Sequence, residues 1–81
     1  MNTRWQKPVL IAFETPGEYT SIETTQAASW ALIEDWPIED GDALDKALLI
    51  CAAVDAGRKK PEDARKAFLA AAVEAGLDFK A

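Results

Sequence analysis

The sequence predicts one small α+β domain in which a β-hairpin is followed by three α-helices, in the order ββααα. A run of strand-forming residues around a Pro-Gly turn lies near the N-terminus, and three stretches with helical apolar spacing follow it. At 81 residues the chain has room for a single domain. We therefore expect one domain over residues 1–81, with residues 1–7 as a loose lead-in.

The hairpin is predicted over residues 8–22. Residues 8–14 are rich in strand formers and begin with a proline, which is tolerated at the first position of a strand. Pro16 and Gly17 favour a type II turn, because proline presets φ at its first central position and glycine accepts a positive φ at the second. Consecutive apolar residues do not alternate, so two inward-facing sets remain open. These sets are Val9 with Ile11, and Leu10 with Phe13.

The first helix is expected to begin at Thr24 or Thr25, since either side chain can cap it, and to run to about Trp36. Pro37 ends it, because the residue before a proline is disfavoured in the α region. Ala28, Ala31, Leu32 and Trp36 form its apolar face, flanked by Ala27, Trp30 and Ile33.

The second helix is expected to begin between Asp40 and Asp42, with Gly57 at its left-handed C-terminal position. The third begins at Pro61, a favoured first helical residue, and ends at Gly76. The expected apolar faces are Leu44, Ala47, Leu48, Cys51 and Val54 for the second helix, and Ala64, Ala67, Phe68, Ala71, Ala72 and Ala75 for the third.

Catalytic chemistry is not expected. The chain has no histidine, and so lacks the commonest general base at neutral pH and the commonest transition-metal ligand. Cys51 lies on the apolar face of the second helix with no group to stabilise a thiolate, and Ser21 and Ser29 have no base to activate them. We expect a non-enzymatic protein with no cofactor and no metal.

Composition also narrows the expected location and partners. One cysteine cannot form an internal disulfide, and the apolar run at residues 9–13 is too short for a signal peptide or a membrane span. We therefore expect a cytoplasmic protein that does not contact a membrane. The net charge of −5 argues against nucleic acid as the main partner.

Two charged segments have alternative interpretations. Acidic side chains crowd the link between the first two helices, namely Glu34, Asp35, Glu39, Asp40, Asp42 and Asp45. They could bind a hard cation, but their spacing does not fit an EF-hand loop, and we favour Asp40 and Asp42 as capping groups of the second helix. The basic residues Arg58, Lys59, Lys60, Arg65 and Lys66 could bind phosphate, or they could simply solvate a loop and complement a helix dipole.

Trp30 and Trp36 lie six positions apart on the first helix, about 120° from one another, so both cannot occupy the centre of one core face. Either Trp36 belongs to the core and Trp30 to an interface, or both lie at the margins of a thin core. The sequence leaves these alternatives open.

Several motifs occur in a characteristic order along the chain. They are Pro8-Val9, Trp36-Pro37, Ala47 with Cys51, Gly57, the run from Pro61 to Phe68, Ala71-Ala72 and Glu74-Ala75-Gly76. This order resembles the small bacterial proteins grouped as domain of unknown function 982. The resemblance implies no activity, cofactor or catalytic residue, and the chain departs from the family pattern at Lys60, where a capping Ser, Thr or Asp often precedes the proline.

These observations favour a protein–protein interaction or regulatory module that binds an unidentified protein or a second copy of itself. A homodimer would use a hairpin edge or Trp30, with residues 34–45 of one copy facing residues 58–66 of the other. The alternative is an accessory protein that binds a small ligand, phosphate or nucleic acid through residues 58–66. The candidate interaction residues are Trp30, Arg58, Lys59, Lys60 and Arg65.

Overall fold

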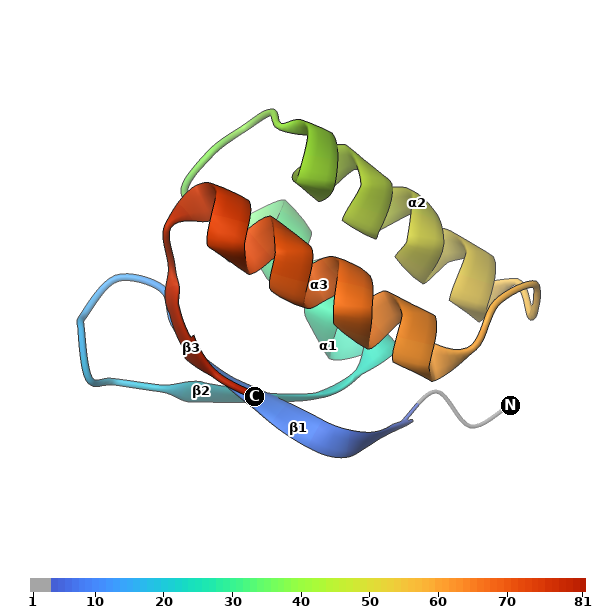
Figure 1. The fold of residues 1–81 in the computed structure, drawn as a ribbon, viewed down its shortest axis with the longest axis horizontal. Helices are drawn as coiled ribbons and strands as arrows, with labels where there is room; N and C mark the ends of the chain where they lie inside the picture. Colours follow the sequence, from blue (N-terminus) through green and yellow to red (C-terminus); the bar gives the residue numbers. More distant parts are fainter. Residues whose placement is uncertain (1–3) are drawn as a thin grey trace.

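The computed structural model describes residues 4–81 and has an α+β fold, with the helices packed on one side of a three-stranded antiparallel sheet (Figure 1). Its elements are β1 (Arg4–Ala12), β2 (Thr20–Thr24), α1 (Thr25–Trp30), the π-helix η1 (Ala31–Asp35), α2 (Asp42–Asp55), α3 (Pro61–Ala75) and β3 (Asp78–Lys80). The predicted fold class and three helical segments are confirmed. The prediction of a two-stranded sheet is wrong, because β3 adds a strand.

β1 begins at Arg4, so the prediction of a loose lead-in is wrong for residues 4–7, while residues 1–3 lie outside the described part. Trp5 is only 4% exposed, and its Nε1 donates a hydrogen bond of 3.2 Å to Thr25 Oγ1. Its ring centroid lies 5.8 Å from that of Phe68. These contacts anchor the start of the strand, although the pairing with β2 is irregular between Arg4 and Val9.

β3 pairs antiparallel with β1 on the side opposite β2, and the sheet order is β2-β1-β3. Phe79 lies opposite Ile11 and packs against the core. The Tyr19 hydroxyl donates a 2.5 Å hydrogen bond to Asp78 Oδ2, and this bond raises the pKa of the phenol. β1 is therefore the central strand, and the exposed edges of the sheet belong to β2 and to the short β3.

The side of the hairpin that faces the helices carries Val9 and Ile11, which are fully buried, together with Ile22 from β2. Leu10 is 37% exposed on the other side of the sheet. Of the two sets that the sequence left open, the structure has Val9 with Ile11 inside. Phe13, beyond the end of β1, is half-buried against Trp36.

α1 begins where the sequence predicts it, because Thr24 is its N-cap and its Oγ1 accepts a 3.0 Å hydrogen bond from Ala27 N. The predicted single helix changes to the wider η1 at Ala31 and ends before Trp36, whose backbone is extended ahead of Pro37. α2 and α3 begin and end close to their predicted limits. Gly57 and Gly76, which follow them, have φ values of 79° and 72°.

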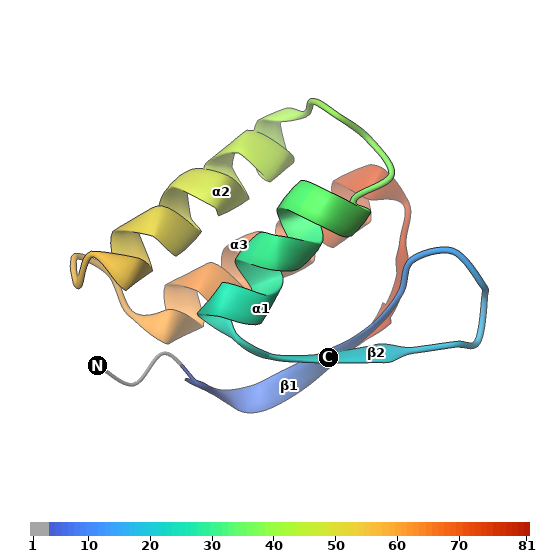
Figure 2. The same cartoon turned by 180° about the vertical axis from the view of Figure 1, so that it is seen from behind.

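α3 is the centre of the fold and contacts α1, α2 and β1. Its Phe68 is 0% exposed, and the Phe68 ring centroid lies 5.3 Å from that of Trp36. Alanines make up most of the rest of its buried face, and these small side chains allow the neighbouring helices to approach closely. Seen from behind, α1 lies in front of α3, with α2 above both (Figure 2).

The N-terminus of α2 is capped by a side chain that is distant in the sequence. Glu74, near the end of α3, accepts hydrogen bonds from Ala43 N through Oε2 (2.9 Å) and from Leu44 N through Oε1 (3.1 Å). The N-cap residue is Gly41, so the prediction that Asp40 and Asp42 cap this helix is wrong. A β-carbon at position 41 would collide with the Glu74 carboxylate, and glycine therefore leaves the space that the cap occupies.

We expect Glu74→Ala to lower the free energy of unfolding by about 1 kcal/mol, the usual cost of losing a capping side chain. Gly41→Ala should have a similar effect in the wild type, because its methyl group displaces the carboxylate. It should cost much less in a Glu74→Ala background, where no cap remains to be lost. Urea denaturation of both single variants and the double variant measures this coupling. Glu39→Ala, on the exposed link, is the control, and additive losses would contradict the cap.

Candidate functional site

The groups that could act as nucleophiles are poorly placed for catalysis. Cys51 is buried in the core, and burial raises the pKa of its thiol, against the smaller opposite effect of a hydrogen bond with Ser29. Ser21 Oγ donates to Glu23 Oε2 at 3.3 Å on exposed β2. Within residues 4–81, no group of three or more Cys, Asp or Glu side chains is arranged to hold a metal ion. No helix in the same part of the chain is long and apolar enough to cross a membrane.

An exposed apolar pair lies on the outer side of the first helical segment. Trp30 ends α1 and is 56% exposed, and Ile33 in η1 is 66% exposed. Both side chains lie where this helical segment is open to solvent, and we call this exposed pair the Trp30 face. Exposed Glu34 and Asp35 follow it in η1. The Trp30 face is therefore apolar with an acidic border.

Local packing explains why Trp30 points outward. Ala28, Ala31 and Leu32 are buried, so the side of the helix that carries Trp30 and Ile33 is left toward solvent. Trp36, beyond the end of η1, is half-buried and contacts the rings of Phe13 and Phe68. Of the two arrangements that the sequence left open, the structure has the one in which Trp36 packs against the core and Trp30 lies outside it.

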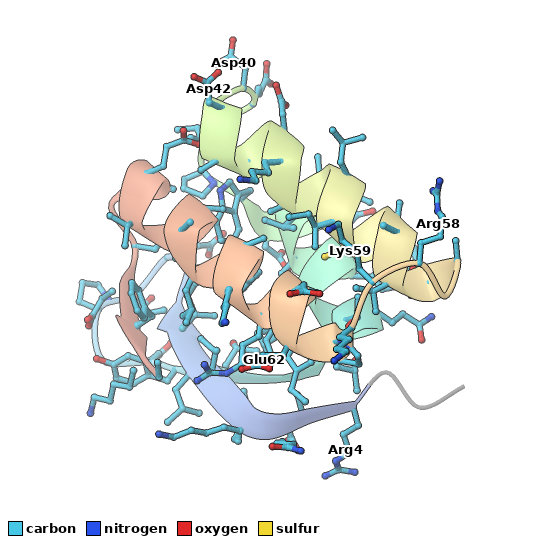
Figure 3. All side chains as sticks on the ribbon, turned by 45° about the vertical axis from the view of Figure 1, so that its right-hand side comes forward. Arg4, Asp40, Asp42, Arg58, Lys59 and Glu62 are labelled. Atoms are coloured by element: carbon cyan, nitrogen blue, oxygen red, sulfur yellow. The ribbon has the colours of Figure 1, made fainter. Side chains whose placement is uncertain are left out.

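The other candidate residues are basic and belong to α3 and to the loop that precedes it. Arg58, Lys59 and Lys60 are exposed in the loop between α2 and α3, and Arg65 lies one turn into α3. Figure 3 shows Arg58 and Lys59 at this loop, away from Asp40 and Asp42 at the other end of α2. In the structure, Trp30 and these basic residues do not lie in one common site.

The structure also adds two cations that sequence reasoning did not connect with this cluster. Arg4 and Lys7 belong to β1, and β1 lies beside the start of α3. Arg65 Nε donates a 2.8 Å hydrogen bond to the backbone oxygen of Lys7, which ties the two elements together. No local pattern could have revealed this, because the two residues are 58 positions apart. We call the combined set the basic end, comprising Arg4, Lys7, Arg58, Lys59, Lys60, Arg65 and Lys66.

α3 divides the basic end into two grooves. One groove, of about 440 Å³ between β1 and α3, is lined by Arg4, Lys7, Lys60 and Arg65, with Trp5, Gln6, Pro61 and Glu62. The other, of about 370 Å³ between α2 and α3, carries Lys46, Lys59 and Lys66 beside Asp63 and apolar residues. Of the predicted basic candidates, Lys60 and Arg65 therefore share a groove, Lys59 lines another, and Arg58 lines neither.

Charge is separated along the long axis of the molecule, which extends over 34 Å. The basic end lies at the side of the α2–α3 loop, on the right in Figure 1. The segment between η1 and α2 lies at the left and is strongly acidic, with Glu39, Asp40 and Asp42 exposed next to Glu34 and Asp35. The two ends of one copy therefore carry opposite charge, as the sequence segments predicted.

Comparison with known proteins places the chain in a family. The family model described as Protein of unknown function (DUF982) matches residues 7–79, so the chain belongs to that family and the resemblance found in its motifs is confirmed. No curated protein and no solved structure shows significant similarity to the chain. The family description assigns no activity to the chain.

Proposed function

We propose that this member of the DUF982 family is a non-enzymatic interaction module that pairs with a second copy of itself through the Trp30 face. The observation that carries the proposal is the exposure of Trp30 and Ile33, 56% and 66%, on one side of the first helical segment. Tryptophan in particular is enriched among the residues that contribute most to protein–protein binding. Burying both would remove from water the two large hydrophobic side chains that this helical segment exposes.

Charge supports a second copy as the partner. α1 runs obliquely across the molecule, from the side of the basic end toward the acidic segment (Figure 2). A two-fold axis that lies in the plane of the Trp30 face and perpendicular to α1 would place the two α1 helices antiparallel. The acidic segment of each copy would then lie beside the basic end of the other, and this complementary contact would occur twice. The same surfaces in a parallel arrangement would bring like charges together.

We expect the wild-type protein to sediment between the mass of one 8.8 kDa chain and twice that mass, depending on concentration in the micromolar range. Trp30→Ser should weaken the association about tenfold or more, as expected for a central aromatic contact. Ile33→Ser should act in the same direction, and added salt should weaken the dimer because exposed opposite charges are screened. Sedimentation equilibrium measures all of these effects.

Leu49→Ser is the matched control, because Leu49 is 72% exposed on α2 and lies outside the Trp30 face. It removes a similar apolar side chain and should leave the association unchanged. A single monomeric mass at every concentration would contradict self-pairing. An equal loss in Trp30→Ser and Leu49→Ser would contradict the specific role of the Trp30 face.

A further inference from the structure

We infer that the groove between β1 and α3 is a binding site for a small phosphate-bearing anion. The groove lies at the basic end and shares no residue with the Trp30 face, although the acidic segment of a second copy would lie beside the basic end in the proposed pair. Cations from two elements converge on it, Arg4 and Lys7 from β1 with Lys60 and Arg65 from the start of α3. The chain has a net charge of −5, so the positive charge around this groove is opposite in sign to that of the protein as a whole.

Two of the lysines have no ion-pair partner in the described part of the chain. Lys7 and Lys60 are both exposed, and the ion pairs found among residues 4–81 involve other cations. Lys60 uses its backbone N–H to donate to Asp63 Oδ2 at 3.1 Å, and its ammonium group takes no part in that contact. Both ammonium groups can therefore donate to an anion without first breaking a contact within the protein.

Arg65 is positioned for binding by the fold itself. It is half-buried, and its Nε is held by the Lys7 carbonyl at 2.8 Å. A guanidinium group that is held through Nε can still donate from both of its terminal nitrogens. These two donors can bind two oxygens of one phosphate. Because the side chain is already ordered, little rotational freedom is lost when a ligand binds.

One acidic side chain lines the groove, and its negative charge partly offsets the cations there. This side chain is Glu62, which lies 3.9 Å from Lys66 Nζ in an exposed contact of small energy. Asp63 lines the other groove, and its carboxylate accepts from Lys60 N at the start of α3. Arg4 is paired with Glu23 on β2 at 3.0 Å, in an exposed contact of small energy. Arg4 therefore adds to the positive field of the groove but is not one of the groups that contact the anion directly.

The dimensions of the groove favour a small ligand. Its volume of about 440 Å³ lies within the range of ordinary small-molecule sites. Several cations around one small volume suit the concentrated charge of a phosphate or diphosphate better than the single carboxylates spaced along an acidic peptide.

The test is calorimetric titration of the full chain with inorganic pyrophosphate at low ionic strength. We expect saturable binding that the double variant Lys7→Gln with Lys60→Gln weakens about tenfold or more, since it removes two direct charge contacts. Arg65→Lys should also weaken binding, because an ammonium group cannot replace the guanidinium fork. The matched control is Lys46→Gln with Lys59→Gln, which removes the same charge from the other groove and should change affinity about twofold at most.

Thermal melts of every variant establish that it is folded before it is titrated. Absence of any pyrophosphate binding at millimolar concentration would overturn the inference. Equal weakening by the two double variants would also overturn it, because the effect would then come from net charge alone. So would binding of an acidic octapeptide in the absence of pyrophosphate binding. Trp30→Ser should bind pyrophosphate at least as tightly as the wild type, because the acidic segment of a second copy no longer competes for the basic end. Pyrophosphate binding by this variant therefore tests the groove whether or not the wild type pairs.

Discussion

Phe68→Ala is expected to leave the domain largely unfolded. Phe68 is the largest side chain with no exposed surface, and it lies between the rings of Trp5 and Trp36, with centroid distances of 5.8 and 5.3 Å. Truncating a buried phenylalanine costs about 3–5 kcal/mol, from lost burial and from the cavity that remains. A domain this small has a total stability of roughly 5 kcal/mol, so little of it would be left.

Urea denaturation followed by circular dichroism measures this effect. Val73→Ala is the matched control, because it also truncates an apolar side chain of α3 but at an exposed position. It should leave the midpoint nearly unchanged. A cooperative transition of Phe68→Ala at the wild-type midpoint would show that Phe68 does not hold the helices and the sheet together.

Trp5→Ala should be the second most damaging substitution, with a loss of about 3 kcal/mol or more. It removes the buried indole that packs on Phe68 and the Nε1–H that donates to Thr25 Oγ1. Trp5→Phe keeps an aromatic ring and should cost less stability than Trp5→Ala. The missing hydrogen bond accounts for about 1 kcal/mol of its loss, and the smaller ring adds a packing cost. Stability measured by urea denaturation compares the two.

Gln6→Ala, at the exposed neighbouring position, is the control for Trp5 and should have almost no effect. Because Trp5 and Phe68 touch, the losses in Trp5→Ala and Phe68→Leu should not add when combined. Wild-type stability of Trp5→Ala would contradict the role of residues 4–7 as an ordered strand and would restore the expectation of a loose lead-in.

The features that the sequence predicted correctly are those with a local cause. Pro61 and Gly76 fix the ends of α3 through backbone geometry, and the capping hydroxyl of Thr24 fixes the start of α1. The exposure of Trp30 was one of two predicted arrangements, since it and Trp36 cannot share the centre of one core face.

The features that it missed depend on contacts between distant segments. Trp5 stands among polar residues in an irregular part of β1, so alternation does not mark it as buried. β3 has three residues, which are too few to show a strand pattern in the sequence. It forms because its backbone pairs with the edge of β1. Glu74 lies 31 positions from the amide of Ala43 that it caps, and Arg65 is likewise tied to Lys7 only in the folded chain.

The most direct measurement of the proposed pairing is an isotope-filtered NOE experiment on an equal mixture of labelled and unlabelled copies, at a concentration where sedimentation shows a dimer. We expect intermolecular NOEs between the Trp30 indole and the Ile33 methyl groups of the other copy, because an antiparallel two-fold contact brings each Trp30 face onto its equivalent. Intermolecular NOEs confined to the β2 edge or to Leu49, with none from Trp30, would contradict it.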